Sequence, residues 1–228
     1  MNFKSTFLGI FLSSSLLFSC NDTSVEIPRG AYEKGVLIMN EGSFGANDGE
    51  VYHLDRDTQV LTRSIFEAEN SRPFAGLLED MVLDGERMYL VANTGKVEIV
   101  NAGTFKSIGA VSGDLDIPRS LAVAGGKLFI SDYGPYDENF NTPNSFVAVV
   151  ANSDGGPVTK KIPVSNKPEG LFTFSNLVLV AGAEEGKIEV IEIQSEEVIQ
   201  TITVEGSPYQ FFLNNDQLVL YVISPNKV

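Results

Sequence analysis

The sequence has few of the side chains on which most catalytic sites depend. It contains one histidine, His53, one cysteine, Cys20, and no tryptophan in 228 residues. A zinc site usually needs several His or Cys ligands, and a Ser-His-Asp triad would have to use His53. That histidine alternates with Tyr52 and Leu54 in a strand-like pattern, so we expect it to be structural. No Walker loop or GxGxxG motif is present. These absences favour a protein that is not an enzyme and has no cofactor.

Positive charge is also scarce. The chain has 16 Lys and Arg against 30 Asp and Glu, for a formal charge of −14. A nucleic-acid partner, or the face of an anionic membrane, would require a basic stripe. The basic residues are scattered along the chain instead, so nucleic acid is excluded as the main partner.

The amino terminus has the pattern of an export signal. A short basic start, Met1 to Lys4, precedes an apolar and Ser-rich run of 13 residues, Thr6 to Phe18, which is too short for a permanent membrane-spanning helix. The run ends Leu17-Phe18-Ser19-Cys20, which resembles a bacterial lipobox, although Phe18 is bulkier than usual. An ordinary secreted protein with an incidental cysteine is the alternative.

We therefore predict three segments. Residues 1–19 are a lipoprotein signal peptide, residues 20–34 a polar tether with its lipid on Cys20, and residues 35–228 the folded domain. The location is then the cell envelope, as an outer-membrane lipoprotein that is periplasmic or surface-exposed.

An internal repeat organises the folded domain. "PRSLAVAGGKLFISD" from Pro118 matches "PEGLFTFSNLVLVAG" from Pro168 and "PYQFFLNNDQLVLYV" from Pro208, and the segment from Leu78 fits without the proline. A second half-unit starts at Gly49, Gly95 and Gly186, and Asn144 takes the same place in one unit. Both residue types tolerate positive φ at a tight turn.

Each unit therefore holds four short strands, A to D, in about 40 residues, with no helical periodicity. This pattern is typical of the four-stranded antiparallel blades of an all-β propeller. A β-sandwich is the alternative fold, but it gives no reason for the same four strands to recur.

The repeat resembles a known family. "GKVEIVNAGTFKSIGAVSG" and "GKIEVIEIQSEEVIQTITVEGSPY" are similar to the YVTN repeats of YncE-like propellers, and "GVLIMNEGSFGANDGEVYHLD" resembles the start of YncE-like surface lipoproteins of the Bacteroidetes. The resemblance covers Gly35 to Val228. It implies a binding protein, and relatives of the BtuG type capture cobalamin beside an outer-membrane transporter.

The strand count predicts an incomplete ring. The domain begins with a B strand, Val36 to Asn40, because the preceding Ala31 to Lys34 is too short and polar for an A strand. Three complete units follow, and then only the A and B strands of a unit that starts at Pro208. The resemblance implies seven blades, so we expect an open arc of four to five blades, truncated at the C-terminus, with exposed strand edges.

Two long B–C loops are the candidate binding surface, since loops on a rigid scaffold commonly carry function. They are Asn40 to Gly49 and Ser131 to Asn144. Their aromatic side chains, flanked by Gly, Asn and Asp, suit a contact surface; these are Phe44, Tyr133, Tyr136 and Phe140. A self-packed loop that hides its own rings is the alternative.

A second candidate is the mouth of the central channel. The start of strand A carries Glu79, Arg119, Glu169 and Tyr209 in successive units. These polar groups predict either a binding ring or structural ion pairs between blades, and an exposed pair would contribute little stability.

The acidic residues of the loops are weak metal candidates. Asp132, Asp137 and Glu138 lie in one loop and the run Asn47-Asp48-Gly49-Glu50 in the other. Calcium needs six or more oxygens, and solvated acidic loops are the simpler interpretation. A divalent-cation-dependent hydrolase or lyase is thus the alternative function.

The predicted function is a lipid-anchored propeller that binds a small molecule, a glycan or a partner protein on its loop-rich face. A TonB-dependent transporter is a candidate partner, and a scaffold role within such a transport complex is a third hypothesis.

Overall fold

The computed structural model describes residues 30–214, 216 and 219–225. The predicted signal peptide, Cys20 and most of the predicted tether lie outside the described residues. Among those described, no helix has the length and apolar character needed to cross a membrane.

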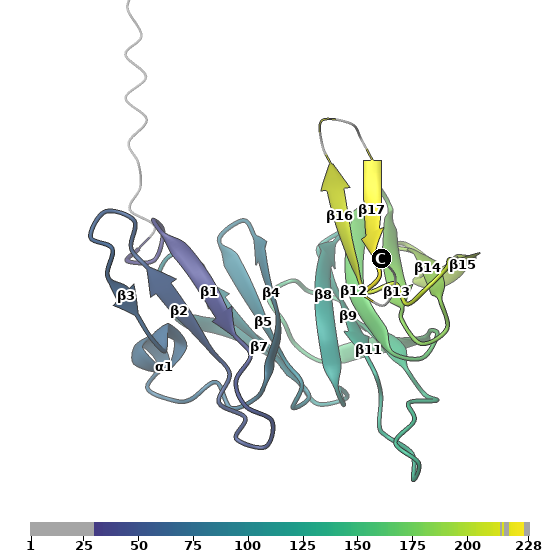
Figure 1. The fold of residues 1–228 in the computed structure, drawn as a ribbon, viewed down its shortest axis with the longest axis horizontal. Coiled ribbons are helices and arrows are strands. Elements are labelled where there is room, and N and C mark those ends of the chain that lie inside the picture. The colour runs from purple at the N-terminus through teal and green to yellow at the C-terminus, as the bar shows by residue number, and fades with distance from the viewer. Residues whose placement is uncertain (1–29, 215, 217–218, 226–228) are drawn as a thin grey trace, which may run out of the picture.

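The described residues form five antiparallel sheets that follow one another in chain order along an open arc (Figure 1). The prediction of an all-β, propeller-like and unclosed arrangement is confirmed. The first sheet consists of β1 (Val36–Asn40), β2 (Glu50–Leu54) and β3 (Leu61–Thr62). Residues 31–34 form a turn and a bend, so this sheet has no A strand in the described part of the chain.

Three complete four-stranded sheets come next, each in the order A-B-C-D. The second sheet is β4 (Leu78–Asp84), β5 (Arg87–Ala92), β6 (Lys96–Asn101) and β7 (Ser107–Ser112). The third is β8 (Pro118–Ala124), β9 (Lys127–Asp132), β10 (Phe146–Val150) and β11 (Val158–Pro163). The fourth is β12 (Pro168–Phe174), β13 (Leu177–Gly182), β14 (Lys187–Glu192) and β15 (Glu197–Thr203). The fifth sheet is the hairpin of β16 (Gln210–Asn214) and β17 (Val219–Ile223).

Two-residue turns join strands A and B in the complete sheets. The first turn residue has positive φ in each case, 59° at Gly85, 59° at Gly125 and 56° at Ser175. Such turns match the natural twist of paired strands. The short spacing between the two halves of the repeated proline segment is therefore explained.

One short helix was not expected from the sequence. The six residues of α1 (Ile65–Asn70) lie between β3 and β4, with Ile65 and Phe66 fully buried. Six residues are too few to show helical periodicity, and tertiary packing supplies most of the stability of so short a helix.

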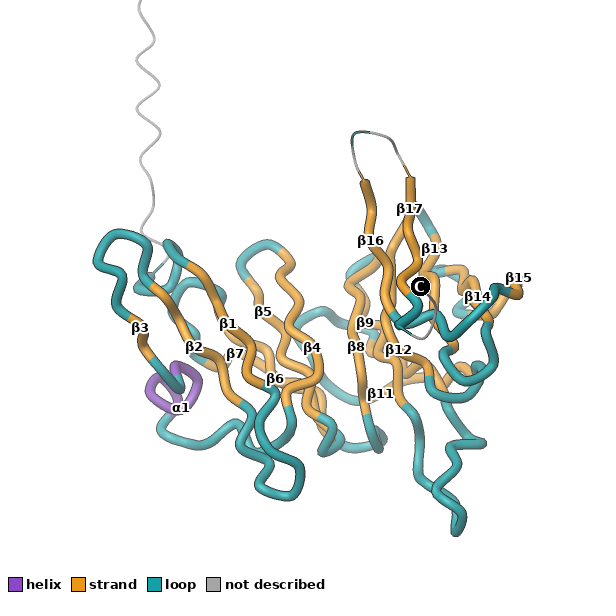
Figure 2. Tube along the Cα trace, viewed as in Figure 1, coloured by secondary structure: helices purple, strands orange, loops and turns teal. Residues whose placement is uncertain are grey.

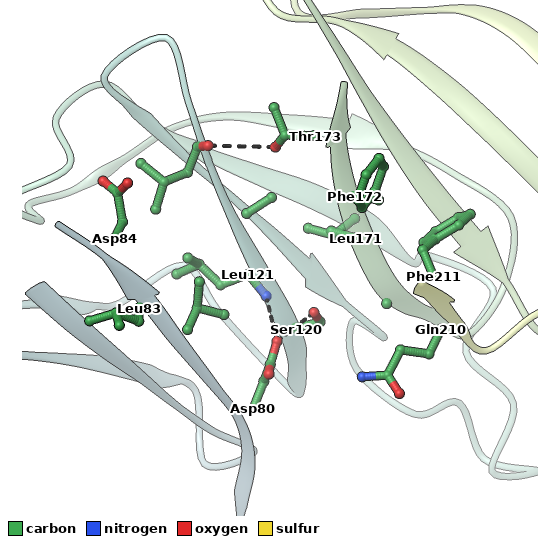
Figure 3. A pocket seen from close by; sticks show the side chains of 14 residues that line it. Asp80, Leu83, Asp84, Ser120, Leu121, Leu171, Phe172, Thr173, Gln210 and Phe211 are labelled. Carbon is green, nitrogen blue, oxygen red and sulfur yellow. Dashed lines mark hydrogen bonds between the residues drawn. The ribbon is translucent and has the colours of Figure 1, made fainter. Parts of the chain in front are cut away.

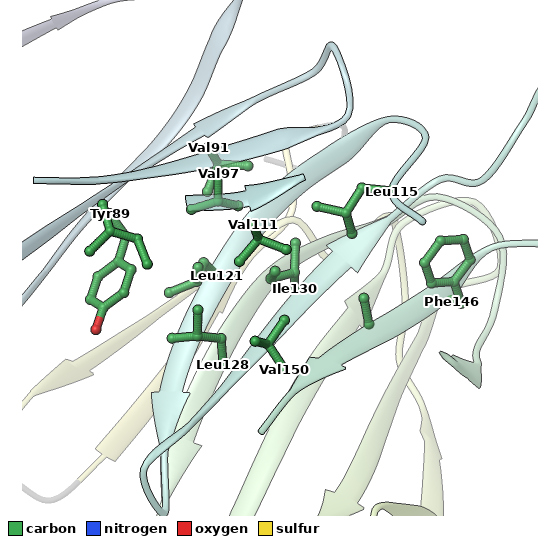
Figure 4. Close-up of a cluster of buried hydrophobic side chains, with 12 residues drawn as sticks. Tyr89, Val91, Val97, Val111, Leu115, Leu121, Leu128, Ile130, Phe146 and Val150 are labelled. Carbon is green, nitrogen blue, oxygen red and sulfur yellow. The ribbon is translucent and has the colours of Figure 1, made fainter. Parts of the chain in front are cut away.

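The hydrophobic core is divided among the interfaces between neighbouring sheets. Figure 4 shows the cluster between the second and third sheets, where Tyr89, Val91 and Val97 face Leu121, Leu128 and Ile130. A second cluster packs α1 and β2 against the second sheet, and a third joins the third and fourth sheets. Each blade is thus stabilised by the blades beside it.

Candidate functional site

One backbone contact recurs in all three complete sheets and sets the candidate site. The residue just before strand A accepts a hydrogen bond from the backbone N–H at the start of the B–C loop, 16 residues later. The pairs are Leu77 with Asn93, Ile117 with Tyr133 and Lys167 with Ala183, each at 3.1 Å. The B–C loops and the starts of the A strands therefore share one face.

At that face, three of the predicted channel-mouth residues form an ion-pair cluster across three sheets. The guanidinium of Arg119 on β8 lies 2.7 Å from Glu79 Oε1 on β4 and 3.3 Å from Glu169 Oε2 on β12. The side chains of Glu79 and Glu169 are 7% and 11% exposed and that of Arg119 is 20% exposed. Because the pairs are shielded from water, the attraction within each is stronger than in an exposed pair, and removing one partner would leave a buried charge without compensation.

Two tyrosines complete this cluster. The Tyr133 hydroxyl donates to Glu169 Oε1, and Arg119 stacks 5.0 Å from the centre of the Tyr133 ring. Tyr209 lies close enough to Arg119 and Glu169 for their charges to act on its hydroxyl, and it remains 41% exposed. We call Glu79, Arg119, Tyr133, Glu169 and Tyr209 the arginine cluster. The sequence predicted four of its members as a ring, and it placed Tyr133 among the loop aromatics.

Burial and charge oppose each other in this cluster. Burial raises the pKa of Glu79 above its ordinary value, and the opposing influence of the nearby Arg119 does not cancel this rise. For Arg119, burial disfavours the charge, but Glu169, Tyr133 and Glu79 together raise its pKa above the ordinary value. Burial also raises the pKa of Tyr133. The cluster therefore holds one fixed positive charge between two carboxylates and ties neighbouring blades together, while only Tyr209 offers much surface to a ligand.

The long loop is fixed at its base by Asp132. This fully buried carboxylate accepts backbone N–H bonds from Asp116 and Ile117 at 2.9 Å and from Gly134 at 2.7 Å. Burial raises its pKa, and the hydrogen bonds oppose the shift. Asp132 therefore holds the base of the loop in place through these three backbone contacts.

A second aspartate shapes the tip of the same loop. Asp137 Oδ1 accepts the backbone N–H groups of Asn139 and Asn141, both at 2.8 Å, and these bonds hold the pKa of Asp137 below its usual range. Glu138 beside it is exposed. Across the described ranges, no three His, Cys, Asp or Glu side chains gather where they would hold a metal ion, so the three weak metal candidates are not brought together.

The tip presents two aromatic rings to solvent. Phe140 is 80% exposed and Tyr136 50% exposed, with ring centres 6.3 Å apart. Phe140 also has a φ of 61°, which is uncommon for a bulky residue. Phe105 has a similar φ of 57°, but it is fully buried in the second core cluster. Phe140 adopts the same costly backbone geometry without comparable burial.

The first long loop carries the third exposed ring. Phe44 is 94% exposed, and Asp48 Oδ1 accepts the backbone N–H of Ser43 at 2.6 Å. Backbone bonds from Leu78 to Glu41, at 3.0 Å, and from Gly49 to Gly76, at 2.9 Å, fix the loop base. Figure 2 shows both long loops projecting from the same side of the arc. Of the four predicted loop aromatics, three are exposed there and Tyr133 is buried.

His53 occupies a structural position. It is 3% exposed, its Nε2 lies 2.9 Å from the backbone oxygen of Lys34, and Tyr32 packs edge-on against its ring.

Sequence reasoning missed a set of buried glutamates in the C strands. Glu98 makes a two-point pair with Arg72 at 2.7 and 2.8 Å, and Glu189 accepts both the N–H and the hydroxyl of Ser165 at 2.8 Å. A glutamate at the centre of the apolar runs "KVEIV" and "KIEVI" was the available signal. These carboxylates anchor the connections between blades.

Comparisons with known proteins agree with the fold. A β-propeller domain of Cps50 (Swd1) from Myceliophteria thermophila matches with a TM-score of 0.58 and 12% identity, over 79% of this chain and 57% of that one. Hydrazine synthase of Kuenenia stuttgartiensis matches with a TM-score of 0.53 and 20% identity, over 66% of this chain and 43% of that one. The chain thus spans less than two thirds of either structure, and at these identities the likeness shows the fold alone.

No curated protein matches the sequence. A family model described as "Domain of unknown function (DUF5074)" matches residues 34–224, which is most of the chain. The repeated strands, the propeller-like sheets and this match agree, and the chain belongs to the DUF5074 family.

Proposed function

We propose that this protein is a non-enzymatic, YncE-like binding propeller of the Bacteroidetes type, anchored in the outer membrane through a lipid on Cys20. The fold supports this coarsely, because a β-propeller suggests a binding or scaffold role. Its ligand is a small molecule, a glycan or a partner protein such as a TonB-dependent transporter. The ligand contacts the aromatic loop tips, which are Phe44, Tyr136 and Phe140.

The observation that carries this proposal is the exposure of Phe140 on a strained, internally fixed turn. A positive φ in a bulky residue costs free energy, and exposed aromatic rings next to polar groups are typical of contact surfaces. Asp137 fixes the turn before any ligand arrives, which lowers the ordering cost of binding. The burial of Tyr133 against Glu169 assigns that tyrosine a supporting role.

Isothermal titration of the purified chain with cobalamin and with a panel of glycans tests the site. For whichever probe binds, Tyr136→Ala combined with Phe140→Ala should lower affinity at least about tenfold and leave the unfolding midpoint unchanged. Ile108→Ala is the matched control, because Ile108 is 54% exposed on β7, away from the loops. Unchanged affinity in the double variant contradicts the site.

If no probe binds, co-purification with a TonB-dependent transporter tests the protein-partner form of the proposal. The same double variant should then reduce the amount of transporter recovered. Equal recovery with wild type and variant contradicts this form as well.

The anchor is tested separately. Cys20→Ser should abolish incorporation of labelled fatty acid and retention in the membrane fraction, whereas an unlabelled wild-type protein contradicts the lipoprotein assignment. A thermal shift with calcium against EDTA addresses the enzymatic alternative, which predicts strong stabilisation by the cation.

A further inference from the structure

A groove runs along the inner strands, separate from the aromatic loop tips. It is a cavity of about 380 Å³, within the range of small-molecule sites, and it lies against β4, β8, β12 and β16. We call it the inner groove. None of the residues proposed above for ligand contact lines it.

One wall of the inner groove is apolar and aromatic. Leu121 and Leu171 contribute to it, and Phe172 and Phe211 come from neighbouring blades with ring centres 6.2 Å apart and planes tilted by 41° (Figure 3). This wall can cover the apolar body of a ligand, and the faces of its rings attract positive charge.

The charge of the groove has one sign. Asp80 and Asp84 are the ionisable residues among its described lining, which includes no Lys, Arg or His. On a strand, residues i and i+4 share a face about 13 Å apart, so one small ammonium cannot contact both carboxylates. Asp80 lies deeper and is part-buried, whereas Asp84 is exposed.

Within the described part of the chain, the hydrogen-bond donors to Asp80 are all neutral. Its oxygens accept from the Ser120 hydroxyl at 2.6 Å, from the backbone N–H of Met81 at 2.8 Å and from that of Leu121 at 3.3 Å. An ionised carboxylate offers about four acceptor positions, so one is left. Burial raises the pKa of Asp80 despite these bonds, as expected for a carboxylate without a positive partner.

We propose that the inner groove binds an organic ammonium with an apolar body. The ammonium donates a charge-assisted hydrogen bond to Asp80, and the apolar part lies against Phe172 and Phe211. Gln210, whose side chain points toward Asp80 across the groove in Figure 3, provides a further polar contact. This site goes beyond the loop-tip function, and neither depends on the other.

Three probes of nearly equal shape test the sign of the charge. Tryptamine carries an ammonium, tryptophol replaces it with a hydroxyl, and indole-3-propionate carries a carboxylate. Titration of the purified full chain should show tryptamine binding at least about tenfold more tightly than tryptophol, a difference of about 1.4 kcal/mol, and no binding of the carboxylate. Equal binding of tryptamine and tryptophol overturns the proposal.

Variants locate the site. Asp80→Asn keeps the shape and an acceptor oxygen, and it should abolish the preference for tryptamine. Asp114→Asn makes the same charge change at an exposed residue outside the groove and should leave the preference intact. Equal losses in the two variants indicate general electrostatic attraction and overturn the site.

A second variant avoids dependence on the folding of Asp80→Asn. Gln210→Lys places a competing ammonium in the groove on the side that faces Asp80, from an exposed position on the edge hairpin. It should abolish tryptamine binding without lowering the unfolding midpoint. Full tryptamine affinity in this variant overturns the proposal.

Discussion

The third and fifth sheets share the A and B strands of the repeat, yet they bury very different shares of the apolar side chains on those strands. In β9, the B strand of the third sheet, every residue from Leu128 to Asp132 is buried. Neither β16 nor β17 of the fifth sheet has a buried residue, and Phe212 is 60% and Ile223 48% exposed. In the first sheet β1 is similar, with Val36, Ile38 and Met39 each about two-fifths exposed, whereas β2 packs into the second cluster.

The difference teaches where a propeller's stability comes from. An alternating strand specifies two faces, but a face becomes a core only when a neighbouring blade covers it. The three buried clusters lie at such covered interfaces. Uncovered apolar strands instead offer edges and faces to other chains. Four predictions test this contrast, from the largest expected effect to the smallest.

Removing a ring from a covered interface should have the largest effect. Phe129→Ala deletes a fully buried side chain of the third cluster, and it should lower the free energy of unfolding by about 3–5 kcal/mol. Phe212→Ala deletes the same ring where it is 60% exposed and should cost less than about 1 kcal/mol. Urea unfolding followed by circular dichroism measures both, and equal costs would refute the contrast.

Breaking the arginine cluster should come second. Arg119→Met leaves Glu79 and Glu169 without their shared positive partner, so we expect a loss of about 2–4 kcal/mol. Arg119→Lys should lose less stability than Arg119→Met but remain less stable than the wild type, because one ammonium cannot reproduce the stacked guanidinium. Glu185→Gln is the control, since it breaks an exposed pair with Lys187 and should cause no measurable loss. A stable Arg119→Met protein contradicts an inter-blade role.

The pH dependence should be smaller and should originate at the covered interfaces. Burial raises the pKa values of Glu50, Glu79 and Asp80 above their ordinary 4.5, 4.5 and 3.8. The folded state then binds these protons more readily than the unfolded state, so stability should rise as pH falls from neutral toward those raised values.

Glu98 acts in the opposite sense, because burial raises its pKa but the bonds from Arg72 outweigh this and lower it. Its stabilising contribution is fully present above its ordinary pKa of 4.5 and is lost as pH falls from there through the lowered pKa of the folded state. Urea unfolding at about pH 7.5 and about pH 5 should therefore show greater stability at the lower pH. In Asp80→Asn the increase should be reduced, and an unchanged slope would count against the assignment.

Charging the uncovered faces should barely affect folding. Ile199→Lys with Val222→Lys places two charges on the exposed β15 and β17, and it should change the free energy of unfolding by no more than about 0.5 kcal/mol. Light scattering should show reduced self-association, while Ile108→Lys on β7 should not reduce it. Equal association in all three proteins would show that the end faces are not adhesive.

The repeat could be predicted because its determinants are local. Gly95 and Gly186 do adopt positive φ, at 79° and 63°, as a tight turn into strand C requires. Gly49 and Asn144 are not among the positive-φ residues, and each follows one of the two longer loops, which reach strand C by a different path. Glu79, Arg119 and Glu169 were found because one repeat position maps to one place in space.

Features that depend on contacts between distant segments could not be predicted. Tyr133 stood among exposed-looking loop residues, but its burial depends on Glu169, which lies 36 residues later. The helix α1 and the inner groove likewise exist only after neighbouring blades have packed. Periodicity places residues on a face, but it does not tell which face another blade covers.

The closed base of the loop that follows β9 has a consequence for how such a protein can change. Tyr133 is bonded to Ile117, and the Ser145 hydroxyl lies 2.9 Å from the backbone oxygens of Tyr133 and Thr142. The two ends of the loop are therefore held together independently of the residues between them. Residues 135–141 can therefore be lengthened or replaced, in evolution or by design, to change specificity while the rest of the fold stays the same.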